Sequence, residues 1–235
     1  MDELERIRSE YDRRARDPRY RLWYSRFNAA DIYLLQERER QVLQLLAEYT
    51  DENWSNFHVL EIGSGDGHQL SKFVAYGLGG KNLTGIELLF ERASRAKTRY
   101  PHLQFVCGDG AVLPYGTHSF DLVFQFTVFT SILDKEMRRR MAAEMMRVLK
   151  PRGLVLWYDY RLNPTNPQTR GIERDEIVAL FPNCEYVFRR ITLAPPIARK
   201  IAPRSWFACA VLSQLPFLKT HYLALIRKKH SEASV

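Results

Sequence analysis

Val59-Leu-Glu-Ile-Gly-Ser-Gly-Asp-Gly67 is a short hydrophobic run that leads directly into three glycines at alternate positions. Glycine adopts positive φ without steric cost and lets a ligand approach the backbone. The residues that follow have a helical pattern, and the N-terminus of a helix offers backbone N–H groups without partners inside the helix. The stretch therefore predicts a strand, a tight turn and a helix that together bind a cofactor.

The spacing of these glycines argues against a dinucleotide cofactor. Counted from Gly63, the dinucleotide fingerprint G-x-G-x-x-G requires its third glycine at the position of His68. Glu61 places a carboxylate immediately before the turn, where it suits a cationic amino-acid group better than a pyrophosphate. The turn thus favours a positively charged cofactor over NAD.

Short β-rich runs alternate with helical patterns along most of the chain, which is typical of βαβ units and a parallel sheet. We expect strands at residues 57–62, 82–87, 104–107, 120–126, 154–158, 186–192 and 221–227. We expect helices at residues 30–49, 67–76, 89–99, 135–149 and 173–181, and a proline-interrupted helix between 195 and 215. In the helix at 135–149, a methionine stripe that includes Met137 and Met141 indicates core packing rather than a cofactor site.

The first 30 residues are dense in arginine and aromatic side chains, and Pro18 breaks any continuous helix there. We expect residues 1–50 to form an N-terminal helical cap or lid. Residues 51–235 then form the main domain.

Three later landmarks accompany the glycine turn. Gly85-Ile-Glu87 ends the second predicted strand with an acid, and Cys107-Gly-Asp-Gly110 follows the third. Phe120-Asp-Leu-Val-Phe-Gln-Phe126 is the fourth strand, and Val148-Leu-Lys-Pro-Arg-Gly153 leads into the fifth. Over about residues 55–160, these segments and the turn resemble class I methyltransferases that use S-adenosyl-L-methionine (SAM). The similarity is to the small-molecule type, near enzymes of quinone and polysaccharide pathways.

This resemblance implies an α/β fold: a Rossmann-like seven-stranded sheet, mostly parallel with an antiparallel last strand, and helices on both faces. The cofactor it implies is SAM, with Glu87 accepting hydrogen bonds from the ribose hydroxyls and Asp109 holding the adenine amino group. The implied cofactor-binding residues are Glu61, Gly63, Ser64, Gly65, Gly67, Glu87, Leu88, Asp109, Gly110 and Phe126. No metal is expected, because the three cysteines are far apart and none belongs to a CxxC pair.

The reaction implied needs little acid–base chemistry, because the methyl group of SAM is already activated on a sulfonium. Alignment of the acceptor supplies much of the rate, and a base helps if the acceptor is a hydroxyl. Asp159, at the start of the loop after the fifth strand, and His221, before the last strand, are the candidate catalytic residues. A structural role for each of them remains open.

The net charge of +8 is concentrated in residues 186–231, which hold no Asp or Glu. Basic surfaces attract phosphates, as in nucleotide sugars, RNA and anionic lipids, although charge runs are also often merely solvated. The basic residues of this segment are Arg189, Arg190, Arg199, Lys200, Arg204, Lys219, Arg227, Lys228 and Lys229.

The expected acceptor is a sugar or glycan-linked hydroxyl on a small, lipid-linked or nucleotide-linked molecule, methylated on oxygen for polysaccharide biosynthesis. The alternatives are a quinone or lipid methylated at a membrane surface that residues 186–231 contact, an RNA, and a non-catalytic SAM-binding role. RNA is disfavoured because no RNA-binding module is recognisable, and no DNA partner is expected.

The compartment expected is the cytoplasm, with the inner face of the membrane as a peripheral location. The N-terminus lacks the apolar run of a secretory signal, and no stretch of about 18 apolar residues exists. The cysteine usage fits a reducing environment.

Overall fold

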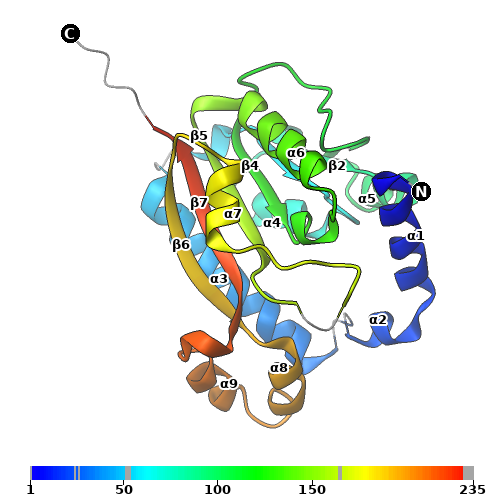
Figure 1. The fold of residues 1–235 in the computed structure, drawn as a ribbon, viewed down its shortest axis with the longest axis vertical. Coiled ribbons are helices and arrows are strands. Elements are labelled where there is room, and N and C mark those ends of the chain that lie inside the picture. Colours follow the sequence, from blue (N-terminus) through cyan, green and yellow to red (C-terminus); the bar gives the residue numbers. More distant parts are fainter. Residues whose placement is uncertain (1, 24, 26, 51–53, 164–165, 230–235) are drawn as a thin grey trace.

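A single seven-stranded sheet organises the chain in the computed structural model, which describes residues 2–23, 25, 27–50, 54–163 and 166–229 (Figure 1). The strand order is β3-β2-β1-β4-β5-β7-β6. The strands are β1 (Val59–Ile62), β2 (Leu83–Glu87), β3 (Gln104–Cys107), β4 (Phe120–Phe126), β5 (Leu149–Tyr160), β6 (Cys184–Leu193) and β7 (Lys219–Lys228). Only β7 among these strands runs antiparallel, and it pairs with both β5 and β6. The expected Rossmann-like sheet is confirmed.

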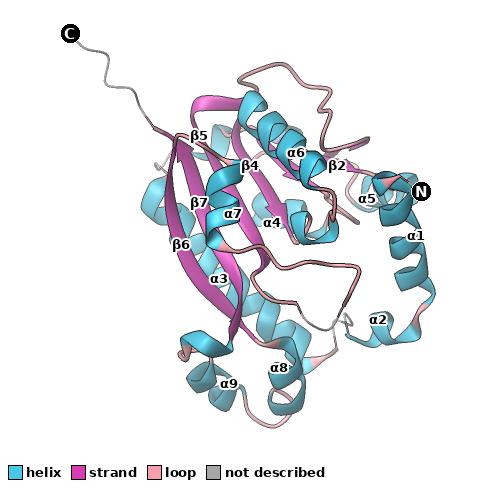
Figure 2. Ribbon diagram, in the orientation of Figure 1, coloured by secondary structure: helices cyan, strands magenta, loops and turns pink. Residues whose placement is uncertain are grey.

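Helices cover both faces of this sheet (Figure 2). They are α1 (Glu3–Arg16), α2 (Pro18–Trp23), α3 (Ala29–Tyr49), α4 (His68–Ala75), α5 (Phe90–Arg99), α6 (Lys135–Val148), α7 (Arg174–Leu180), α8 (Pro195–Ile201) and α9 (Trp206–Leu212). Within the described residues, none of these helices is both long and apolar enough to cross a bilayer.

The alternation of side chains along each strand builds two cores. In β1, Leu60 and Ile62 pack with α6 and α7, whereas Val59 packs on the opposite face with α3 and α4. Successive strand residues point to opposite faces of a sheet, so β1 is buried along its whole length. This burial explains why its sequence is continuously apolar except for Glu61.

The strand order creates a crevice above β1. From β1 the chain moves outward to β2 and β3, then returns to pair β4 on the other side of β1. Ligands of open α/β sheets bind outside the carboxyl ends of the strands at such a reversal. The glycine turn follows β1 at this point.

Two elements differ from the sequence-based expectation. β5 begins at Leu149 instead of residue 154, because the Lys150–Gly153 stretch is extended and leads into the strand after an irregularity in its pairing with β4. The helix expected between 195 and 215 is two short helices, since α8 ends before Pro203 and α9 starts after the capping Ser205.

The N-terminal helices occupy two different places. α3 packs beneath the sheet through Val42, Leu45 and Leu46, whereas α1 lies at the edge where the carboxyl ends of the strands meet (Figure 1). The division of the chain into a cap of residues 1–50 and a domain of residues 51–235 stays a prediction.

Candidate functional site

Three left-handed glycines shape the turn between β1 and α4. The φ angles are +68° at Gly63, +56° at Gly65 and +79° at Gly67, a region that other residues adopt at a cost. The N–H groups of Gly63 and Ser64 donate to the carbonyl of Ile86, at 2.8 and 3.0 Å. The turn is therefore tied to the end of β2, with α4 starting directly behind it.

Glu87 joins this turn to the end of β2. One carboxylate oxygen accepts the N–H of Gly65 at 2.7 Å, and the other accepts the N–H of Leu89 at 3.0 Å. Each carboxylate oxygen has two acceptor positions, so one on each oxygen remains for a ligand. A pair of vicinal hydroxyls suits these two positions.

A cavity of about 140 Å³ opens at the carboxyl ends of β1, β2 and β4. Six of the residues expected to bind the cofactor line it: Gly63, Glu87, Leu88, Asp109, Gly110 and Phe126. Asp109 accepts the N–H of Ala111, which fixes the loop after β3. The structure thus brings together residues from four separate segments of the sequence.

The other four expected residues are not among the described residues that line the cavity. Gly65 and Gly67 shape the turn, and Ser64 is buried below it against Gly85. Glu61 is also buried and accepts the N–H of Leu70, and this burial raises its pKa well above the ordinary value. Glu61 therefore fastens α4 to β1, and its direct contact with a cofactor stays a prediction.

Side chains that sequence reasoning did not assign to the site complete the cavity. Ile7 and Tyr11 reach it from α1, and Met137 and Met141 reach it from α6. The two methionines belong to the core, as expected, but the expectation that they stand apart from the site is wrong, because both also line the cavity. Their i, i+4 spacing predicts one buried face of the helix. The sequence does not show which strands this face packs against, and so it does not show that the face reaches the cavity.

Arg92 lies over the glycine turn in this structure. Guanidinium nitrogens of Arg92 lie 4.0 Å from a carboxylate oxygen of Glu87 and 3.9 Å from one of Asp66. The guanidinium carbon lies 5.1 Å from the centre of the Tyr11 ring. A Cβ placed on Gly65 would lie 2.5 Å from the nearest guanidinium nitrogen. A ligand that approaches the turn must therefore displace Arg92.

Thr127 stands next to this cavity with strained backbone. Its φ is +60°, its N–H donates to the carbonyl of Tyr158, and it lines the cavity beside Phe126. Non-glycine residues in this conformation often mark functional sites, because the surrounding structure must enforce them.

Asp159 lies behind the cavity and holds the loop after β4. Its carboxylate accepts the hydroxyl and the N–H of Thr130 and the N–H of Tyr160, at 2.5, 3.2 and 2.9 Å. Burial raises its pKa to about 6, and the hydrogen bonds oppose that rise. Asp159 is not among the described residues that line the cavity, and its catalytic role stays a prediction.

His221 is stacked in an aromatic cluster at the ends of β5 and β7. The ring centres of Tyr158 and Tyr160 lie 4.7 and 3.9 Å from it, and Thr220 is hydrogen-bonded to its Nδ1. Burial lowers its pKa well below the ordinary value, which keeps the ring neutral at pH 7. His221 is likewise absent from the described cavity lining, so its role also stays a prediction.

Comparison with known proteins agrees with this geometry. Residues 60–157 match the model of a family described as a methyltransferase domain. This central segment of the chain is therefore similar to a methyltransferase domain. The matched segment runs from β1 to β5 and contains the glycine turn, Glu87 and Asp109.

Three similar proteins show how far the likeness extends. The demethylmenaquinone methyltransferase of Renibacterium salmoninarum is 25% identical over 124 residues, 53% of this chain and 49% of that protein, so the match spans about half of its length. The structure of a Pyrococcus horikoshii protein superposes with a TM-score of 0.62 at 15% identity, covering 91% of this chain and 99% of that one. A TehB-like SAM-dependent methyltransferase from Corynebacterium glutamicum gives 0.54 at 17% identity, covering 82% and 97%.

The domain and the fold imply SAM as the cofactor, and the site fits it. Glu87 keeps two acceptor positions, which would suit two ribose hydroxyls, and Asp109 lies on the loop after the neighbouring strand. Apolar side chains such as Ile86 and Leu88 line the space between them. The site therefore fits the cofactor that the matched segment and the fold imply.

Proposed function

We propose that this chain transfers the methyl group of SAM to a small acceptor, and that the first candidate is a quinone-type ring. The observation that carries methyl transfer is the carboxylate of Glu87, fixed by two backbone N–H groups at the wall of the cavity. SAM supplies a methyl group already activated on its sulfonium.

The residues of this chain act mainly by positioning. Glu87 and Asp109 orient the nucleoside, and the glycine turn lets the backbone approach it. Ile7 and Tyr11 of α1 cover the cavity and exclude water from it. Positioning of this kind can supply roughly 7–11 kcal/mol of the barrier reduction.

An aromatic side chain at the cavity supports a planar acceptor. Phe126 lines the cavity, and its ring packs edge-on against Tyr158 at 5.4 Å. The guanidinium carbon of Arg38 lies 5.0 Å from the centre of each of these rings. Phe126 is half-buried and lines the cavity, so it offers a ring against which a flat acceptor packs well. The relative from Renibacterium salmoninarum is named for a quinone substrate, which agrees with this choice.

A sugar or glycan-linked hydroxyl is the second candidate, methylated on oxygen in polysaccharide biosynthesis. Its support is the exposed pair Lys200 and Arg204 on the α8–α9 segment, since arginine binds phosphate well and such acceptors are carried on diphosphates. For this acceptor, a base is needed to remove the hydroxyl proton, and Asp159 and His221 remain the candidates.

Two measurements test this function. S-Adenosylhomocysteine at about 100 times its Kd should stabilise the protein by about 2.7 kcal/mol, while NAD and ATP leave the melting temperature unchanged. Radiolabelled methyl transfer from SAM should then label one of four matched fractions: quinones, lipid-linked glycans, nucleotide sugars or RNA. Stabilisation by NAD alone would contradict the cofactor, and label in RNA alone would contradict both acceptors.

A further inference from the structure

Residues 206–217, which we call the α9 surface, expose an unusual number of apolar side chains. By comparison, Phe90 and Val112 have no other exposed large apolar residue near them in the sequence, as is usual on protein surfaces. The exposed apolar side chains of the α9 surface are Trp206, Phe207, Val211, Leu215 and Phe217, with Phe207 80% and Phe217 73% exposed.

The helix α9 is apolar on both of its sides. On the inner side, Cys209 is fully buried and Leu212 packs with it in a cluster that includes Ala30 of α3 and Ala198 of α8. On the outer side, Phe207 and Val211 are exposed one helical turn apart. A helix that is apolar all round is normally covered on every side, so the outer side of α9 calls for a second apolar environment.

Positive charge borders this surface. Lys200 and Arg204 are exposed directly before it, and residues 186–231 contain no Asp or Glu. By contrast, Arg189 is paired with Glu48 at 2.5 Å and Arg227 with Glu185 at 2.6 Å. Arg189 and Arg227 are thus paired on the sheet, whereas Lys200 and Arg204 stand next to the exposed apolar side chains in the sequence.

The α9 surface lies at the same edge of the sheet as the cavity. α8 and α9 follow the carboxyl end of β6 and precede β7, and β6 is parallel to β4 and β5 (Figure 1). The carboxyl ends of β1, β2 and β4 surround the cavity. A flat partner that covered α9 would therefore lie along the edge at which the site opens.

We infer that the α9 surface binds the interface of an anionic lipid bilayer. Phe207 and Phe217 enter the acyl region, and Lys200 and Arg204 contact the anionic headgroups. Apolar side chains flanked by Lys and Arg are the arrangement that interfacial segments use, and their binding adds apolar burial to electrostatic attraction. This inference does not depend on the identity of the methyl acceptor.

Co-sedimentation of the full chain with vesicles tests it. The unmodified protein should pellet with phosphatidylcholine mixed with phosphatidylglycerol, and much less with phosphatidylcholine alone. The double variant Phe207→Ser/Phe217→Ser should bind the mixed vesicles at least about tenfold more weakly. Lys200→Gln/Arg204→Gln should lose about fivefold in vesicle affinity for each charge removed. High salt should lower the vesicle affinity of the unmodified protein in the same way.

Matched controls change exposed residues elsewhere. Val112→Ser removes an equally exposed apolar side chain, and Lys135→Gln removes an exposed charge, so both should bind like the unmodified protein. Unchanged melting temperatures and unchanged affinity for S-adenosylhomocysteine show that each variant is folded. Absence of vesicle binding overturns the inference. A dimer in solution that Phe207→Ser dissociates also overturns it, because the α9 surface is then an interface between two copies.

Discussion

Glu87 fixes the glycine turn to the end of β2 and is the proposed contact to the ribose of the cofactor. It is 5% exposed, and both of its oxygens accept backbone N–H groups on opposite sides, from Gly65 and Leu89. A glutamine keeps the shape but offers one acceptor oxygen, and its amide N–H faces a backbone N–H. The charge and one of the two acceptors are therefore lost together.

Glu87→Gln should weaken the binding of S-adenosylhomocysteine by about 10- to 100-fold, because hydrogen bonds to charged groups contribute about 1.5–3 kcal/mol. Isothermal calorimetry measures the change. Glu91→Gln, an exposed change in the first turn of α5, should bind like the parent. Equal affinities in all three proteins would place the cofactor elsewhere.

The raised pKa of Asp159 predicts a specific pH dependence of the free energy of unfolding. Its folded pKa of about 6 lies above the ordinary 3.8, so between these values the folded state holds the proton more tightly than the unfolded chain. The contribution of Asp159 to the free energy of unfolding is complete below about pH 4 and is lost as the pH rises through about 6.

The free energy of unfolding of the parent, relative to Asp159→Asn, should thus fall by about 2–3 kcal/mol between about pH 4 and pH 7. Urea denaturation at several pH values measures it. The comparison cancels the opposite contribution of His221, whose lowered pKa reduces stability as the pH falls. A constant difference across this range would show that Asp159 is already charged in the folded protein.

Residue-level sequence reasoning found the part of the site that local chemistry specifies. Gly63 and Glu87 stand at the turn and at a strand end, where a hydrophobic run stops, so their positions are visible in the sequence. Tyr11 and Arg92 carry no such local signal. Their place over the turn depends on how α1 and α5 pack, which periodicity does not specify.

At the scale of elements, the turn between β1 and α4 needs glycine for two reasons: its left-handed backbone conformation and the close approach of a ligand to the backbone. Gly65→Ala should destabilise the protein by about 1–2 kcal/mol, because φ is +56°, and its Cβ should also weaken S-adenosylhomocysteine binding more than tenfold. Urea denaturation and calorimetry measure the two effects.

Gly77 provides the matched control for that change. Its φ is +97°, and a Cβ there would meet nothing within 4 Å. Gly77→Ala should therefore lose comparable stability but bind S-adenosylhomocysteine like the parent. Equal loss of affinity in both variants would mean that the turn acts only through global stability.

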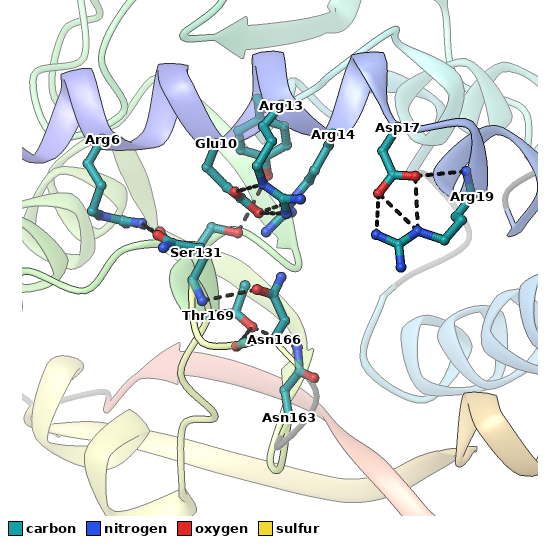
Figure 3. A network of polar contacts seen from close by, with 12 residues as sticks. Arg6, Glu10, Arg13, Arg14, Asp17, Arg19, Ser131, Asn163, Asn166 and Thr169 are labelled. Carbon is teal, nitrogen blue, oxygen red and sulfur yellow. Dashed lines mark hydrogen bonds and ion pairs between the residues drawn. The ribbon is translucent and has the colours of Figure 1, made fainter.

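The helix α1 contributes Ile7 and Tyr11 to the cavity lining and is held by polar contacts to neighbouring loops (Figure 3). Arg6 donates to the carbonyl of Ser131 at 2.5 Å and to the side chain of Gln168 at 3.2 Å. Glu3 accepts the N–H groups of Leu133 and Asp134. These contacts join α1 to the segment after β4 and to the loop after β5.

Arg6→Ala should raise both the association and the dissociation rate constants of S-adenosylhomocysteine by about tenfold, since the bonds that it removes hold the cover closed. Stopped-flow fluorescence measures both rates. Arg8→Ala, an exposed change on the same helix, should leave them unchanged. Unaltered rates in Arg6→Ala would show that ligand enters by another route.

The elements that the sequence predicted least well contain proline, which can either interrupt an element or lie at its start. Pro151 lies in the extended start of β5, where pairing with β4 is irregular and its missing N–H is tolerated. Pro203 separates α8 from α9, whereas Pro195 begins α8 in the position where proline is favoured. Tertiary context decides between these outcomes, and a single sequence does not contain it.

At the scale of the whole molecule, the sheet was predictable because each strand is a separate apolar run. The strand order was not predictable, and neither were the contacts of α1 with the loops after β4 and β5. They depend on residues more than 120 positions apart in the sequence, such as Arg6 and Ser131, which are 125 positions apart. The charges show the same limit. The sequence located the basic segment, and the structure showed that Arg189 and Arg227 in it are paired with carboxylates.

The position of β7 has a consequence for synthesis. Because β7 lies between β5 and β6, those two strands have no common neighbour until residues 219–228 have left the ribosome. Domains fold as units while the nascent chain emerges, so this one must wait for its seventh strand. Ribosome-bound chains stalled before residue 219 emerges should be cut by protease within β5, and chains stalled after residue 228 emerges should resist.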